Sequence, residues 1–280
     1  MPTLAAARSF LFAPASDEHK LRKALESEAD VVVADLEDAV SLEQKDAARD
    51  VVRGVLAEPY SGALVAIRVN GAGTSFFAED IALTRALRPD VLVLPKATPV
   101  ALGALDAEGP PVVAIVETAD GLRHAYEVAW LPRVEALVVG AIDLGVELRL
   151  EPRADGLEVL FARSKVVLDS AAAGIRGPVD RVFVDVRDRR GLEDDARFAR
   201  SLGFRGKACV HPDQVEVVNR VFTPSDEELS HALRVVEAYE HAVGAGEGVT
   251  ALDGEMIDLP VVERARQVLA LAERSAVDAS

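Results

Sequence analysis

The feature that most constrains the fold is one unit, a short apolar run followed by a helical pattern, which occurs eight times before residue 223. The apolar runs are residues 8–13, 30–36, 63–70, 90–96, 111–117, 135–143, 180–186 and 205–211. Apolar runs that alternate with helices indicate parallel βαβ units. Eight consecutive units predict a closed (β/α)8 TIM barrel.

A doubly wound nucleotide-binding sheet is the competing fold. It needs a glycine-rich first turn, and the stretch GAGTSF at 71–76 lacks the third glycine of that fingerprint. After residue 222 the pattern changes to two helices joined by a glycine-rich segment. We therefore expect a barrel domain over residues 1–222 and a helical extension over 223–280 that packs on the barrel or on a neighbouring subunit.

Charge and composition exclude several classes of partner. The 280 residues carry a net charge of −16, which disfavours nucleic acid and membrane surfaces. Cys209 is the single cysteine, so no internal disulfide forms and a reducing, cytoplasmic location is expected. The N-terminus has no basic residue ahead of its apolar residues, as a signal peptide would. No stretch has the roughly 18 uninterrupted apolar residues of a membrane span.

Charged residues stand where the predicted strands end, which is the functional face of such a barrel. The second run, DVVVADLEDAV, closes on Asp35, Glu37 and Asp38. The other runs close on Arg68 and Asn70, Lys96, Glu117, Asp143, Asp185 and His211. We expect these side chains to gather at the mouth of the barrel.

Several of these residues have two interpretations. Glu117 and Asp143 lie one βα unit apart, so they could share one Mg²⁺ with water and a ligand, or each could cap the helix that follows it. Arg68 could pair with the acids of the second strand, hold a substrate carboxylate with its two-pronged guanidinium, or do both. Lys96 could be a Schiff-base nucleophile or a counter-ion for nearby carboxylates.

A set of short motifs in register carries a family resemblance. They are RSFLFAPAS, DLEDAV, IRVNG, LPKA, IVETADGL, VVGAIDL, GFRGKACVHPDQV and DGEMID. In this order they resemble the citrate lyase β-subunit family, within the HpcH/HpaI aldolase group that includes malyl-CoA and citramalyl-CoA lyases. The resemblance runs from Arg8 to about Ala270.

The resemblance implies an enzyme, a Mg²⁺-dependent carbon–carbon lyase. Such an enzyme cleaves a citryl-CoA-like or malyl-/citramalyl-CoA-like 3-hydroxyacyl thioester into acetyl-CoA and a 2-oxoacid such as oxaloacetate. Glu117 and Asp143 match the family's Mg²⁺ ligands, and Glu117 also belongs to the substrate site. Arg68 matches the arginine that holds the oxoacid carboxylate. Glu37 and Asp38 match the acids behind the metal and the arginine.

The resemblance also implies a shared site. Asp258 resembles the acid that enters the active site of a neighbouring subunit, which implies a homo-oligomer, a trimer or a multiple of it. The alternative function is a non-catalytic or partner-dependent barrel that binds metal and oxoacid within a larger assembly, where an acyl carrier rather than CoA bears the thioester. One departure is Ala15, where the family usually has a glycine that lets a ligand approach the backbone.

Overall fold

The computed structural model describes residues 3–58, 60 and 62–278. The chain divides into two compact units, one ending at Phe222 and the other beginning at Thr223. Each unit has its own hydrophobic core.

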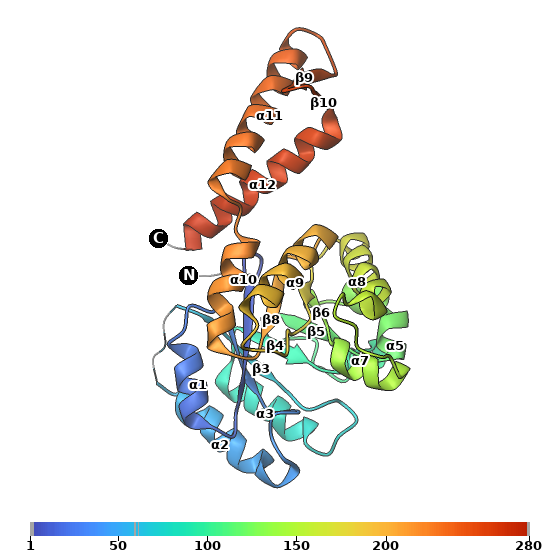
Figure 1. Ribbon diagram of the computed structural model, residues 1–280. Coiled ribbons are helices and arrows are strands. Elements are labelled where there is room, and N and C mark those ends of the chain that lie inside the picture. The colour runs from blue at the N-terminus through green and yellow to red at the C-terminus, as the bar shows by residue number, and fades with distance from the viewer. Residues whose placement is uncertain (1–2, 59, 61, 279–280) are drawn as a thin grey trace. The chain divides into compact units, whose positions relative to one another are not determined.

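The first unit is built on a closed parallel barrel, so the fold class predicted from the sequence is confirmed (Figure 1). Each strand pairs with the next along the chain, and β8 pairs with β1 through Ser9 and Lys207 to close the ring. The strands are β1 Ser9–Pro14, β2 Val31–Asp35, β3 Leu64–Arg68, β4 Val91–Leu94, β5 Val112–Val116, β6 Val134–Val139, β7 Val179–Asp180 and β8 Gly206–Cys209.

Helices connect the strands and cover the outside of the barrel. Polar side chains begin several of them: Asp17, Thr98 and Thr118 each accept a backbone N–H of the first turn that has no carbonyl partner within the helix. The helices are α1 Glu18–Leu25, α2 Lys45–Leu56, α3 Phe77–Leu87, α4 Pro99–Gly103, α5 Ala119–Arg123, α6 Ala125–Trp130, α7 Ala141–Leu148, α8 Leu160–Ala173, α9 Arg189–Leu202 and α10 Val215–Phe222.

The strands read as unbroken apolar runs because both of their faces are buried. In β2, Val31 and Val33 belong to the core inside the barrel, whereas Val32 and Ala34 belong to the layer between strands and helices. Successive side chains of a strand point to opposite faces. Asp35 therefore continues the inward series of Val31 and Val33, one layer higher, at the mouth of the barrel.

The seventh and sixth strands are shorter than predicted. We expected strand 180–186, but β7 ends at Asp180, and one reason is that the Arg181 carbonyl accepts a hydrogen bond from Lys207 Nζ instead of a ladder N–H. We expected strand six to reach Asp143, but β6 ends at Val139 and Asp143 lies in the first turn of α7. The helix expected after strand five is divided at His124 into α5 and α6.

The second unit is a pair of helices with its own small core. Helix α11 (Asp226–Gly244) begins with a capping box made by Ser225 and Glu228. It packs against α12 (Leu259–Asp278). The predicted glycine-rich connection contains an antiparallel hairpin, β9 (Thr250–Leu252) and β10 (Glu255–Ile257). The core residues are Ala232, Val235, Ile257, Val262 and Ala265. Across both units, no helix in the described part of the chain has the length and hydrophobicity to cross a membrane.

Burial makes the single cysteine unreactive. Cys209 is fully buried in β8, and this burial raises the pKa of its thiol to about 12. The thiolate is the nucleophilic form, so at pH 8 we expect the native protein to leave a chromogenic disulfide reagent unreacted and the denatured protein to release one equivalent of its chromophore. The variant Cys209→Ser, which has no thiol, is the control. Fast reaction of the native thiol would show that β8 opens readily.

Candidate active site at the barrel mouth

A cavity of about 590 Å³ opens at the carboxyl ends of the strands. Its wall has two unlike halves. The strands β2, β3 and β5 and the start of α7 contribute the charged half, which consists of Asp35, Asp38, Arg68, Glu117 and Asp143. The chain after β7 together with β8 and β1 contributes an apolar half, which includes Phe12, Pro14, Val182, Ala208 and Val210. The charged half makes this cavity the candidate active site.

Arg68 is the centre of the charged half. Its Nε and Nη2 donate to the two oxygens of Asp35, each at 2.6 Å. Its Nη1 lies 3.0 Å from Glu37 Oε2 and 3.5 Å from Asp38 Oδ2. The Phe12 ring centroid lies 5.3 Å from the guanidinium carbon. These contacts fix the position of the guanidinium group and keep it protonated. Arg68 therefore pairs with the acids of the second strand and also lines the cavity.

The three acids at the end of β2 and in the turn after it have different surroundings. Asp35 is buried and also accepts the backbone N–H groups of Glu37 and Ala39, so it braces the turn as well as holding Arg68. Glu37 is buried beside Arg68 and does not line the cavity, whereas the Asp38 side chain is half exposed and does. Burial raises the pKa of Glu37, and the charges of Arg68 and Lys96 oppose that rise.

Lys96 is the partner of Glu37. Its Nζ lies 2.5 Å from Glu37 Oε1 and 3.9 Å from Glu117 Oε1. Burial lowers the pKa of Lys96, but the hydrogen bond and the charge of Glu37 outweigh burial and raise it. A Schiff-base nucleophile needs a neutral amine. The structure therefore supports the counter-ion interpretation of Lys96.

Glu117 is held from two sides. The backbone of Lys96 has a φ of 48°, which is rare for a residue with a side chain, and its N–H donates to Glu117 Oε1 at 2.8 Å. On the other side is Gly140, where an added Cβ would lie 2.3 Å from the Glu117 Cβ and 2.6 Å from Oε2. Only glycine leaves room for this carboxylate. The geometry fixes Glu117 with one oxygen already engaged.

The environment of Glu117 suits a bound cation. The side chain is 2% exposed, and burial together with the charges of Glu37 and Asp143 raises its pKa to about 7. A divalent cation would offset this accumulation of negative charge. Asp143 is partly exposed and lines the same cavity. Two carboxylates with room for water and ligand oxygens fit the preference of Mg²⁺ for oxygen. Within the described residues no group of three or more His, Cys, Asp or Glu forms a metal cage.

The remaining predicted residues lie elsewhere or have structural partners. His211 begins a short 3-10 helix and accepts the N–H of Asp213, and Asp185 accepts the N–H of Arg187. Asp258 lies in the second unit, where its Oδ1 accepts the N–H of Val261 at the start of α12. Sequence reasoning missed Phe12 and Gly140. The signal for Gly140 was a glycine directly after an apolar run, next to the run that ends in Glu117.

Comparisons with known proteins show which family the chain resembles. The family described as HpcH/HpaI aldolase/citrate lyase matches residues 8–212, and the family described as C-C bond lyase of the TIM-barrel fold matches residues 165–276. A (3S)-malyl-CoA thioesterase of Cereibacter sphaeroides is 37% identical over 270 residues, which are 95% of this chain and 94% of that protein.

Two solved structures from Mycobacterium tuberculosis are similar. One is CitE in complex with magnesium, acetoacetate and coenzyme A, with a TM-score of 0.84 and 35% identity over 96% of this chain and 100% of that one. The other is a citrate lyase β subunit complexed with oxaloacetate and magnesium, with a TM-score of 0.71 and 35% identity over 79% of this chain and 99% of that one.

Proposed function

Because the chain belongs to the HpcH/HpaI aldolase/citrate lyase family and is a lyase with Mg²⁺ as cofactor, we propose that it cleaves a 3-hydroxyacyl thioester into an acetyl thioester and a 2-oxoacid. The thioester is citryl-CoA-like or malyl-/citramalyl-CoA-like. The observation that carries the proposal is the convergence of Arg68, Glu117 and Asp143 on one cavity. A guanidinium for a carboxylate and two acids for a cation are what a 2-oxoacid complex requires.

Each residue has a separate task in this proposal. Glu117 and Asp143 hold Mg²⁺, which supplies a Lewis acid for the oxygen that becomes the carbonyl. Arg68, held by Asp35, orients the carboxylate of the oxoacid half. Glu37 and Asp38 set the position and charge of Arg68, and Lys96 balances Glu37.

The reaction needs a proton at carbon. The 3-hydroxyl releases its proton to solvent water, the carbon–carbon bond breaks, and the electron pair of that bond forms a thioester enolate. An acid must then protonate the enolate carbon to give the methyl group of the acetyl thioester. We assign this proton to the Asp258 carboxyl group, supplied by residues 223–280 of a neighbouring copy in a ring-shaped homo-oligomer, in which residues 1–222 are the catalytic barrel.

A release assay tests the function. Citryl-CoA, malyl-CoA and citramalyl-CoA are each incubated with and without Mg²⁺, and acetyl-CoA, free CoA and the oxoacid are measured. We expect acetyl-CoA and oxoacid in equal amounts, and only with Mg²⁺. Free CoA with an intact hydroxyacid would instead indicate thioester hydrolysis, the activity named for the Cereibacter relative. Binding of oxoacid without turnover of any CoA thioester would favour the partner-dependent β-subunit alternative.

The variant Arg68→Lys tests whether Arg68 binds the oxoacid carboxylate or only stabilises the fold. A lysine keeps the charge but cannot span the two oxygens of Asp35 and still present donors to a ligand carboxylate. With Mg²⁺ present, we expect calorimetry to show pyruvate and oxaloacetate binding at least about tenfold more weakly, with a small change in melting temperature. Unchanged affinity for both would show that Arg68 serves only the acids of the second strand.

A further inference from the structure

The apolar half of the cavity is also informative about the ligand. On β8 and β1, the inward positions hold Ala208, Val210, Phe12 and Pro14, and no charged side chain. In a closed ring of eight strands, β7 lies across from β3, so Val182, just after β7, faces the side of the cavity that carries Arg68. A ligand whose carboxylate lies at Arg68 therefore points its remaining substituent towards apolar side chains.

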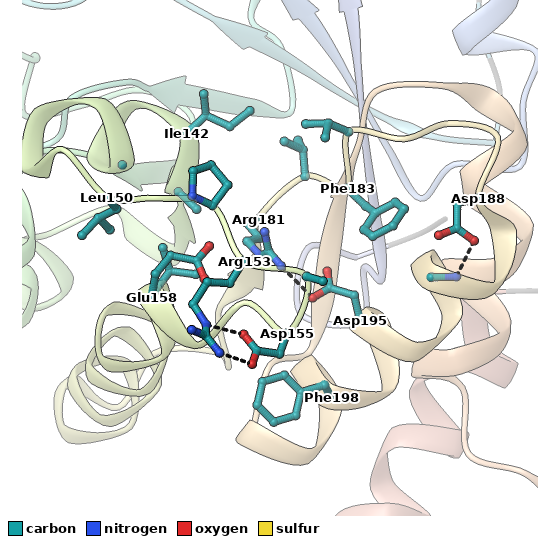
Figure 2. A pocket seen from close by; sticks show the side chains of 18 of the residues that line it. Ile142, Leu150, Arg153, Asp155, Glu158, Arg181, Phe183, Asp188, Asp195 and Phe198 are labelled. Carbon is teal, nitrogen blue, oxygen red and sulfur yellow. Dashed lines mark hydrogen bonds and ion pairs between the residues drawn. The ribbon is translucent and has the colours of Figure 1, made fainter.

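Two cations that directly precede residues of this apolar half, Lys207 before Ala208 and Arg181 before Val182, do not enter the cavity. Lys207 is fully buried, and its Nζ donates to Asp180 and Asp195, each at 2.6 Å, and to the Arg181 carbonyl. Arg181 Nη2 donates to Asp195 in a second cavity of about 860 Å³ (Figure 2). Neither cation lines the cavity that holds Arg68. Both would have to give up these ion pairs in order to turn inward.

The net charge of the cavity lining also disfavours a second carboxylate on the ligand. Four carboxylates line it, and among the described residues Arg68 is the single cation that does. Even with one divalent cation bound, the lining keeps a net negative charge. Arg68 and the cation are both needed for the first carboxylate of an oxoacid and its keto oxygen. A second carboxylate placed against the apolar half would lose part of its hydration and meet no cationic side chain there.

We propose that this cavity selects monocarboxylic 2-oxoacids whose remaining substituent is hydrogen or a small alkyl group, as in glyoxylate and pyruvate, over dicarboxylic ones such as oxaloacetate. The proposal rests on the proposed function and narrows it. The thioester substrates are then of the malyl or citramalyl type, and the citryl type is disfavoured. Selection comes from the apolar half of the wall, whereas the charged half is common to both classes of ligand.

The first test compares substrates. With Mg²⁺, we expect kcat/KM for the better of malyl-CoA and citramalyl-CoA to exceed that for citryl-CoA at least about tenfold, because of the unpaired carboxylate. In parallel, calorimetry with fresh oxaloacetate, glyoxylate and pyruvate measures binding alone. If no thioester is cleaved, the proposed function fails, and the binding order still decides the present proposal. Oxaloacetate that binds as tightly as the better of the other two overturns it.

A charge-insertion variant tests the wall itself. Val210 lines the cavity and is 43% exposed, so Val210→Lys can place an ammonium beside the apolar half without being buried. We expect the preference for pyruvate over oxaloacetate to fall about tenfold or reverse. The matched control is Val184→Lys, at a residue that lines only the second cavity and is 69% exposed. Equal shifts in both variants would show that net charge, not the wall, sets the preference, and would overturn the proposal.

Discussion

Replacing Glu117 by glutamine is expected to lower the turnover rate at least about 10³-fold while leaving the fold intact. Glutamine has the same shape and keeps an oxygen that can accept the Lys96 N–H, so the position of the side chain is preserved. What is lost is a negative charge at a side chain that is 2% exposed. Isothermal calorimetry should show weaker Mg²⁺ binding in the same variant.

The same substitution should stabilise the metal-free protein. Folding raises the pKa of Glu117 from 4.5 to about 7. Between these two pH values, the folded chain therefore keeps a proton on Glu117 that the unfolded chain has released. Above pH 7 the buried charge therefore costs free energy, and the cost disappears as the pH falls from 7 towards 4.5. In EDTA at pH 8, we expect Glu117→Gln to melt at a higher temperature than the parent protein, and at pH 5 the difference should be small.

The control for both measurements is Glu127→Gln, at an exposed glutamate in the first turn of α6. It removes the same charge from the surface, so turnover, Mg²⁺ affinity and melting temperature should stay near the parent values. A Glu117→Gln protein with normal turnover would contradict the assignment of Glu117 to the metal. One that loses turnover and also melts lower would show that the charge holds the fold together.

The barrel could be predicted from the sequence because its signal is repeated and strong. Strands buried on both faces, such as β2 and β5, appear as continuous apolar runs, and the first polar residue after each run marks the mouth. This pattern is enough to identify Arg68, Glu117 and the acids after β2 as residues of the mouth. The pattern is less informative for short strands such as β7. There the Arg181 carbonyl accepts a hydrogen bond from the Lys207 side chain instead of from the backbone of a neighbouring strand.

The sequence could not predict which acidic side chain pairs with which basic one. Asp35, Glu37 and Asp38 all stand at the end of one apolar run, yet Asp35 alone bonds both Nε and Nη2 of Arg68, because it is the last residue of β2 and lies opposite Arg68 in the strand register. The left-handed backbone of Lys96 has no marker in a residue that is not glycine. Nor could the sequence show that Lys207 turns outward. These features depend on which face each side chain occupies, and a shift of one residue reverses that face.

Asp258→Asn is expected to remove turnover as completely as Glu117→Gln, but for a different reason. Asp258 caps α12 through the N–H of Val261, and asparagine is an equally good cap, so the helix should remain intact. The change removes only the acidic proton that we assign to the enolate carbon. Mg²⁺ and oxoacid binding should be retained, because Glu117, Asp143 and Arg68 all lie in the first unit. Full activity of Asp258→Asn would mean that Asp258 is only a helix cap.

Mixing the two inactive proteins tests whether the site is shared between copies. In a ring where each barrel is completed by residues 223–280 of its neighbour, an Asp258→Asn barrel beside a Glu117→Gln neighbour has both carboxylates intact. Random mixing of equal amounts should therefore restore about a quarter of the parent activity per site. Subunit exchange is verified by tagging one variant and recovering the other with it. If mixed oligomers form and stay inactive, each barrel uses its own Asp258 or none, and the proton at carbon must come from another group.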